Sequence, residues 1–148
     1  MSTHSVNYGR IVKELSTEAV VSVDPRFGDP LAPPIVVSAL WDTGANISAV
    51  TPKVVSALGL IPIDHNRACG VNGWYESPIF VIDLMLPNKI QIRGLQVSLG
   101  NMDAADMLIG MDVISLGDLL LTNDGTTRFT IRTPSEGDKP FMKEEVMT

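Results

Sequence analysis

The chain of 148 residues has few of the residues that build disulfides and metal sites, with one cysteine and two histidines. Cys69 alone cannot form an intrachain disulfide, and such a chain is typical of a reducing compartment, so we expect a cytoplasmic protein. His4 and His65 are remote from each other, and no pair of cysteines or histidines has the spacing of zinc ligands. We therefore expect no metal site, and we interpret Cys69 as a small structural residue rather than a nucleophile.

Long apolar runs and clusters of positive charge are also missing. A membrane-spanning helix needs about 20 apolar residues, but glycines and aspartates interrupt the richest stretch, residues 108–121. The first residues lack the basic start and apolar centre of a secretory signal. The net charge is −6 without a lysine or arginine cluster, which disfavours nucleic-acid binding. We expect neither a membrane nor a nucleic acid as a partner.

Aromatic residues are scarce, at 5%, but hydrophobic residues reach 45%, which is enough for a packed core. The length is that of about one domain, so residues 1–148 are predicted to form a single domain with its core at about 8–132. Residues 133–148 combine proline, glycine and charge in a composition that forms no core of its own. We expect this tail to be mobile or loosely laid on the surface, with strand pairing ending near Arg132.

Short apolar runs separated by turn residues predict a mostly β domain, closed or sandwiched. One short helix is expected from Thr51-Pro52 to Gly59, because Thr caps, Pro suits the first turn and Gly ends helices. A second is expected at residues 113–117. Tight turns are expected at Asn72-Gly73 and at residues 87–89. Strands are expected at residues 8–15, 17–24, 35–41, 68–71, 74–86, 90–99, 119–121 and 128–132, with 25–34 as a loop.

The most informative motif is Asp42-Thr43-Gly44, which follows the apolar strand expected at residues 35–41. A carboxylate is thereby delivered to the end of a strand. Gly44 lets backbone approach closely because it has no Cβ, and Ala45 keeps the next position small. Aspartate and glycine are also common in plain turns between strands. The tripeptide alone leaves a catalytic loop and an ordinary turn both open.

This stretch resembles the Asp-Thr-Gly-Ala catalytic loop of aspartic peptidases. Pepsin-like members carry two such loops on two lobes, whereas this chain has one, and no other aspartate is followed by Thr-Gly or Ser-Gly. The chemistry needs two carboxylates that share a proton, so that one activates water while the other polarises the carbonyl. A two-fold dimer brings the same residue of both subunits together. The chain is therefore similar to retropepsins of the cellular or bacterial type, which act as homodimers.

Residues 107–114 strengthen this resemblance. They match the retropepsin segment of an apolar pair, a glycine (Gly110), two variable residues and a short helix. In that family the apolar pair packs behind the catalytic loop, and the glycine permits close packing beside it. Such a run is common in ordinary strand-to-helix turns, but its order and separation from Asp42 favour the family. The resemblance covers about residues 35–132. It implies a mostly β, retropepsin-like closed barrel (the acid-protease fold) with one or two short helices.

The family pattern is broken at two positions. Viral retropepsins usually carry Asp and Arg where this chain has Asn46 and Met111, and those charges pair near the dimer contact. Both partners are replaced together, so no unpaired charge is left buried. The change indicates a coherent variant, and we expect its dimer to depend on apolar packing and on contacts of Thr43.

The Asn72-Gly73 hairpin lies where retropepsins have the flap that folds over the substrate. The resemblance places Gly70, Val71, Asn72, Gly73 and Trp74 at its tip, where backbone would bond the peptide. An exposed structural hairpin is the plain alternative. Trp74 would either line a subsite or pack against the base of its own hairpin.

The resemblance also assigns roles to the residues of the catalytic loop. Asp42 would supply half of the catalytic dyad, and Thr43 would cross the dimer interface to bond the partner's loop. Gly44 would offer its carbonyl to an extended polypeptide substrate, with Ala45 and Asn46 forming part of the substrate-binding surface. Water is the nucleophile, so no cofactor and no covalent intermediate are expected.

Two other functions stay open at this point. One is a catalytically silent retropepsin-like module that dimerises or binds peptides. The other is a β-barrel that binds a small ligand, for which the sequence offers no positive feature.

Overall fold

The computed structural model describes the backbone of residues 2–70 and 72–141, and the side chains of these residues other than 68–70. Strand accounts for 49% of the chain and helix for 8%. The elements in chain order are β1 (Ser2–Asn7), β2 (Ser16–Val23), β3 (Ile35–Trp41), β4 (Ala49–Val50), α1 (Pro52–Leu58), β5 (Asp64–Gly70), β6 (Gly73–Leu86), β7 (Ile90–Leu99), β8 (Met107–Ile109), α2 (Met111–Ile114), β9 (Asp118–Asp124) and β10 (Thr126–Thr133).

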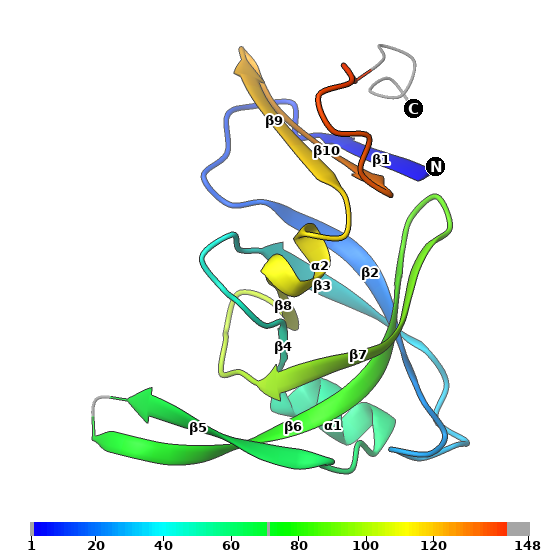
Figure 1. The fold of residues 1–148 in the computed structure, drawn as a ribbon, viewed down its shortest axis with the longest axis vertical. Helices are drawn as coiled ribbons and strands as arrows, with labels where there is room; N and C mark the ends of the chain where they lie inside the picture. Colours follow the sequence, from blue (N-terminus) through cyan, green and yellow to red (C-terminus); the bar gives the residue numbers. More distant parts are fainter. Residues whose placement is uncertain (1, 71, 142–148) are drawn as a thin grey trace.

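Six strands close into a barrel. They follow the order β2-β3-β8-β4-β7-β6, and β6 pairs back onto β2. The β3–β8 and β4–β7 pairs are parallel, and the other pairs are antiparallel. β5 pairs with β6 outside the barrel, so that the β5–β6 hairpin extends from the body of the molecule (Figure 1). The expected mostly β, closed-barrel fold with two short helices is confirmed.

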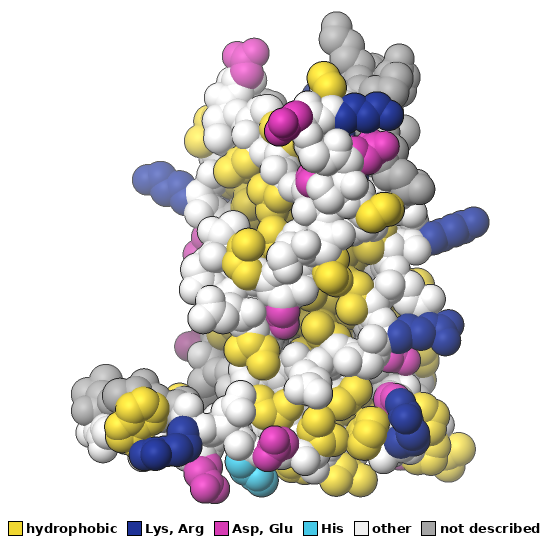
Figure 2. Space-filling view, in the orientation of Figure 1, with side chains coloured by type: hydrophobic (Ala, Val, Ile, Leu, Met, Phe, Trp, Pro, Cys, Tyr) yellow, Lys and Arg dark blue, Asp and Glu magenta, His cyan; other side chains and the backbone are white. Residues whose placement is uncertain are grey.

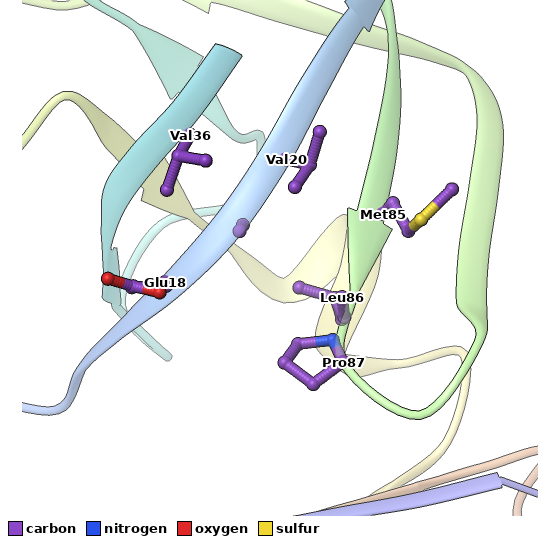
Figure 3. Close-up of a pocket in the computed structure, with 7 residues that line it drawn as sticks. Glu18, Val20, Val36, Met85, Leu86 and Pro87 are labelled. Atoms are coloured by element: carbon purple, nitrogen blue, oxygen red, sulfur yellow. The ribbon is translucent and has the colours of Figure 1, made fainter. Parts of the chain in front are cut away.

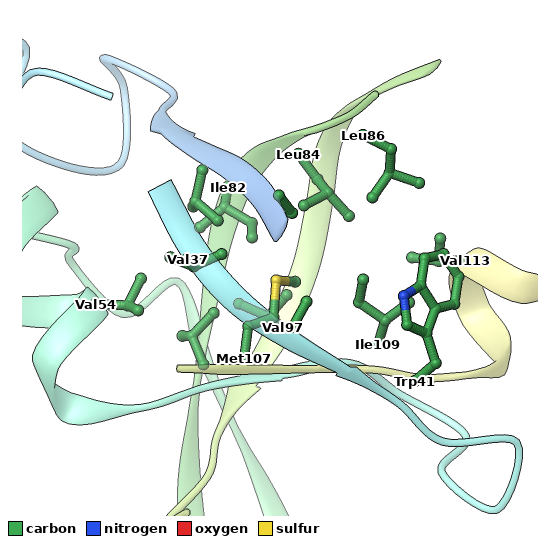
Figure 4. Packing of buried hydrophobic residues seen from close by; sticks show 14 of the residues in the cluster. Val37, Trp41, Val54, Ile82, Leu84, Leu86, Val97, Met107, Ile109 and Val113 are labelled. Carbon is green, nitrogen blue, oxygen red and sulfur yellow. The ribbon is translucent and has the colours of Figure 1, made fainter. Parts of the chain in front are cut away.

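The barrel interior is filled by alternate residues of its strands, as the two-residue period of a strand requires. In β3, Val37, Ala39 and Trp41 are buried, whereas Val36 and Ser38 are exposed. Figure 4 shows Trp41 lying beside Ile109, within the same cluster of buried side chains. Full burial of an aliphatic side chain stabilises by about 1.5–3 kcal/mol, so this interior fixes the direction in which β3 ends.

A second sheet, in the order β1-β10-β9, packs on the barrel (Figure 1). Its buried Phe129 lies against Trp41, with 5.0 Å between the ring centroids. β1 pairs antiparallel with β10 from Ser2 to Asn7. The strand predicted at residues 8–15 is wrong: these residues form a loop, and β2 pairs instead with β3 and β6. The chain turns where the Gly9 amide, at φ 72°, donates to the Asn7 side chain.

Several predicted elements are confirmed. β3 has the predicted bounds, α1 starts with Pro52, and Gly59 ends it in the left-handed conformation at φ 55°. The β6–β7 turn falls at residues 87–89, between the paired Leu86 and Ile90. Thr51 precedes α1 as predicted, but its hydroxyl donates to the Asp106 carbonyl rather than capping the helix.

Three predicted boundaries are wrong. α2 begins two residues earlier than expected, directly after Gly110. β5 begins at Asp64 rather than at residue 68. The hairpin turn was expected at Asn72-Gly73, but Gly73 already belongs to β6 and is paired with Gly70.

The segment after β10 lies over a buried arginine. The Arg132 side chain is 1% exposed and donates to Asp118 and to the carbonyls of residues 137, 139 and 140. Its guanidinium lies 3.9 Å from the centre of the Phe141 ring. Hydrogen bonds from the Ser135 hydroxyl, the Glu136 amide and Arg132 hold the pKa of Asp118 at about 2. Residues 142–148 lie outside the described part of the chain, so the mobility of the tail stays a prediction.

Within the residues that the structure describes, no helix has the length and apolarity to span a bilayer. Figure 2 shows lysine and arginine side chains spread singly over the face in view, with no basic patch gathered there.

Candidate functional site

Asp42 is placed by the end of β3. The Trp41 amide donates to the Leu15 carbonyl, at 2.9 Å, and the Trp41 indole nitrogen donates to the buried Thr17 hydroxyl, at 2.8 Å. The Asp42 amide then donates to the Ile109 carbonyl of β8, also at 2.9 Å. Strand pairing and a buried ring thus fix the backbone on which the half-buried Asp42 carboxylate stands.

The loop after Asp42 folds back on its carboxylate. The Gly44 amide donates to Asp42 Oδ1 at 2.8 Å, and the Ala45 amide donates to the Asp42 carbonyl at 3.2 Å. A Cβ added at Gly44 would lie only 3.1 Å from Asp42 Oδ1. The glycine therefore keeps the space next to the carboxylate oxygen open, while the amide fixes its orientation.

Gly110 packs closely beside this loop, as the resemblance implied. A Cβ at this position would lie 2.7 Å from the Ala45 carbonyl oxygen and 3.1 Å from the carbonyl carbon of Ile47. The next residue, Met111, donates its amide to the same Ala45 carbonyl at 2.8 Å. The absence of a side chain at Gly110 lets α2 lie directly against the backbone of the Asp42 loop.

Ser48 and Asp112 form a clamp that the sequence analysis missed. The Ser48 amide and hydroxyl donate to the two oxygens of Asp112, at 2.9 and 2.7 Å, and Ser48 Oγ accepts the Gly110 amide at 3.0 Å. Asp112 also accepts the Val113 amide at 3.0 Å. An aspartate in the first turn of a helix commonly accepts hydrogen bonds from free amides. The position of Asp112 at the start of the expected helix could therefore have identified it as an acceptor.

A cavity of about 400 Å³ opens beside Asp42 and Thr43. Its walls are mostly apolar, with Lys13, Glu14 and Asn123 as the other polar side chains. It is lined by Val12, Lys13, Glu14, Leu15, Leu40, Trp41, Asp42, Thr43, Leu119, Leu121 and Asn123. Residues 12–15 and β9 were not among the site residues predicted from the sequence. Asp42 therefore lines a hollow large enough for a side chain of a bound peptide.

The β5–β6 hairpin extends away from the barrel in the single chain (Figure 1), and none of its described residues lines this cavity. Gly70 and Gly73 are its last paired residues, and Val71 lies outside the described residues. Trp74 is 65% exposed, with the Arg67 guanidinium 4.9 Å from its ring centre. Of the two roles predicted for Trp74, this contact matches packing on its own hairpin.

The predicted site residues thus fall into two groups. Asp42, Thr43, Gly44, Ala45 and Asn46 share the loop between β3 and β4. The hairpin positions Gly70, Asn72, Gly73 and Trp74 form the second group, and the single chain does not bring it against the first.

A second hollow, of about 200 Å³, lies on the outer face of β2, β3 and β6 (Figure 3). Val20, Val36 and Met85 line it, and Glu18 is its one charged lining residue. Val36 lies near the start of β3, whereas Asp42 follows its end, so this hollow is separate from the carboxylate. Within the described part of the chain, no group of three His, Cys, Asp or Glu side chains is arranged to hold a metal ion.

Comparisons with known proteins agree with this geometry. The model of the aspartyl protease family matches residues 33–113, which contain the Asp42 loop, the hairpin and Gly110. No curated protein matches the chain in sequence.

Two solved structures share the fold. A retropepsin-like aspartic protease from Rickettsia conorii superposes with a TM-score of 0.58 at 14% identity, covering 86% of this chain and 91% of that one. The retroviral protease-like domain of Ddi1 from Leishmania major gives 0.50 at 18% identity, covering 86% and 99%. Since the family model matches more than half of the residues, the chain belongs to the aspartyl protease family and has a retropepsin-like fold.

Proposed function

We propose that the chain is an aspartic endopeptidase that works as a homodimer, with Asp42 of each subunit supplying half of a catalytic dyad. The observation that carries this proposal is the setting of Asp42. Asp42 follows the end of a barrel strand, its carboxylate is oriented by the Gly44 amide, and the residue lines a cavity. Gly110 and the Ser48–Asp112 clamp support the loop from behind.

The dyad explains why two copies are needed. One ionised carboxylate activates water while the other, protonated, polarises the scissile carbonyl. The chain has a single Asp-Thr-Gly, so a two-fold axis beside Asp42 provides the second group. Thr43 is exposed in the single chain, which leaves its hydroxyl available to bond the loop of the partner across that axis.

The substrate class follows from the same arrangement. An extended polypeptide binds by main-chain hydrogen bonds, with alternate side chains entering pockets. The Gly44 carbonyl, Ala45 and Asn46 form one side of the binding surface, and the β5–β6 hairpin closes over the peptide as a flap. Enclosure expels water and strengthens the electrostatic interactions at the scissile bond. A cytoplasmic location fits the single cysteine.

The decisive experiment compares Asp42→Asn with wild-type protein in the digestion of a mixed peptide library. The substitution removes the singly protonated pair with little change of shape, so it abolishes cleavage and leaves folding and dimerisation intact. A dimer with one mutant subunit is inactive too. Wild-type activity follows a bell-shaped pH dependence on the acid side of neutrality, because two close carboxylates titrate as a pair. Asp103→Asn, on an exposed loop, serves as the matched control.

Glu14 provides a second control, because it is an acidic residue that lines the same cavity as Asp42. Glu14→Gln retains cleavage if the dyad joins two Asp42 residues, and it is as inactive as Asp42→Asn if Glu14 is the second acid. Wild-type rates from purified Asp42→Asn would refute the aspartic-peptidase mechanism. A wild-type protein that binds a statine-type transition-state mimic but cleaves nothing would instead support the silent peptide-binding module.

A further inference from the structure

Two segments far apart in the sequence together form one wall of the Asp42 cavity. Residues 12–15 belong to the loop between β1 and β2, and Leu119, Leu121 and Asn123 belong to β9. Figure 1 shows this loop running beside the β9–β10 hairpin. The shape of the cavity therefore depends on what holds the loop to the hairpin.

Thr127 of β10 makes the contacts that join them. Its carbonyl accepts the Tyr8 amide at 3.0 Å, and its amide donates to the Arg10 carbonyl at 2.9 Å. Its hydroxyl accepts the Val12 amide at 2.9 Å and donates to Asn123 Oδ1 at 2.7 Å. The residue is 1% exposed, so water does not readily replace these bonds.

The two partners of this hydroxyl are both cavity residues. Val12 and Asn123 line the hollow beside Asp42. The other end of the loop is fixed where the Leu15 carbonyl accepts the Trp41 amide. Lys13 and Glu14 therefore lie between two fixed points of the loop. The Leu15 carbonyl is bonded to the strand that precedes Asp42, and the Val12 amide is bonded to the Thr127 hydroxyl.

We propose that Thr127 is a positioning residue for peptide binding, which shapes the cavity beside Asp42 before the substrate arrives. The inference rests on the proposed peptidase function. A wall that is already ordered spares the peptide the cost of ordering it. Without the hydroxyl, the part-buried Val12 amide loses its acceptor. An unsatisfied donor of this kind lowers the population of the ordered wall by about tenfold or more. Binding of peptide is affected, whereas the Asp42 chemistry is not.

The chain offers a matched control on the same strand. Thr130 is also 1% exposed, but its hydroxyl bonds Ser5 of β1, and it does not line the cavity. Thr130→Val thus removes a buried threonine hydroxyl from β10 without touching the loop at residues 8–15. A general loss of stability in this sheet affects both variants, whereas a change in peptide binding affects Thr127→Val alone.

The test measures kcat and KM for a peptide that the wild-type protein cleaves, and the Kd of a statine-type mimic, in Thr127→Val, Thr127→Ser and Thr130→Val. In Thr127→Val we expect KM and Kd to rise about tenfold, with kcat within about twofold of wild type. Thr127→Ser keeps the hydroxyl and restores both values. Thr130→Val has wild-type KM and Kd.

The outcomes separate this inference from the proposed function. If wild type cleaves peptides and Thr127→Val matches it in KM and Kd, or Thr130→Val weakens binding equally, the positioning role is wrong and the peptidase stands. If wild type cleaves nothing but binds the mimic, the peptidase is wrong, and the Kd ratio between Thr127→Val and wild type decides the positioning role. If wild type neither cleaves nor binds, both are wrong.

Discussion

Gly110→Ala tests the support of the catalytic loop. The added methyl group would meet the Ala45 carbonyl oxygen at 2.7 Å, with the backbone of Ile47 at 3.1 Å. To restore an ordinary contact of 3.4 Å, the Ala45 carbonyl must retreat by about 0.7 Å. The obstacle is backbone on both sides, so no side-chain rotation relieves it. Overpacking of this kind costs about 1–3 kcal/mol of stability.

The same displacement acts on Asp42, because Ala45 is hydrogen-bonded to the Asp42 carbonyl and to the Met111 amide. A misplacement of about 1 Å in a catalytic group can cost about 100-fold in rate. We therefore expect kcat to fall by about 10- to 100-fold while the free energy of unfolding in urea falls by about 1–3 kcal/mol. Gly100→Ala is the control, since its Cβ would meet only the side-chain carbons of Ala49 and Met102. Unchanged stability and wild-type cleavage in Gly110→Ala would refute this account of the loop.

Three further predictions concern the second sheet and the dimer. Arg132→Met leaves Asp118 and three tail carbonyls without the buried guanidinium, so the free energy of unfolding in urea should fall by about 3–5 kcal/mol. An equal fall in Arg128→Met, which lies on the same face of β10, would contradict this. The folded pKa of Asp118 is about 2 against an ordinary 3.8, so the stability contributed by its carboxylate is complete above pH about 4 and is lost as the pH falls through about 2. The free energy of unfolding should therefore depend less on acid pH in Asp118→Asn than in wild type, and identical curves of unfolding free energy against pH would contradict this. Because Asn46 and Met111 carry no charge, the dimer dissociation constant measured by sedimentation should change only modestly between about 0.1 and 1 M salt. A steep loss of dimer as the salt concentration rises would instead indicate charged contacts in the interface.

Local sequence was enough to predict the elements whose causes are local. The strand before Asp42 follows from the apolar run at residues 35–41, and the bounds of α1 follow from Pro52 and the left-handed Gly59. The close packing at Gly110 was also predictable, because the resemblance implied a glycine that permits close packing beside the catalytic loop.

The loop at residues 8–15 shows where this reasoning fails. Its apolar residues suggested a strand, but a strand needs a partner, and β2 pairs instead with β3 and β6. What holds the loop is Thr127, whose hydroxyl meets Val12 across 115 residues of sequence. The choice between strand and loop was therefore made by long-range pairing, which local propensity does not encode.

The sequence by itself determined that one carboxylate, Asp42, directly follows an apolar strand. It also determined that Gly44 and Ala45, in the loop after it, are small enough for close backbone packing. These are properties of neighbouring residues, and they hold wherever the strand lies. Only the tertiary structure decided what surrounds that carboxylate: the wall from β9 and the β1–β2 loop, and the Ser48–Asp112 clamp across 64 residues. Those contacts arise from barrel closure and from the packing of the second sheet on the barrel. Both bring distant segments together because burying their apolar faces outweighs the entropy of ordering the chain.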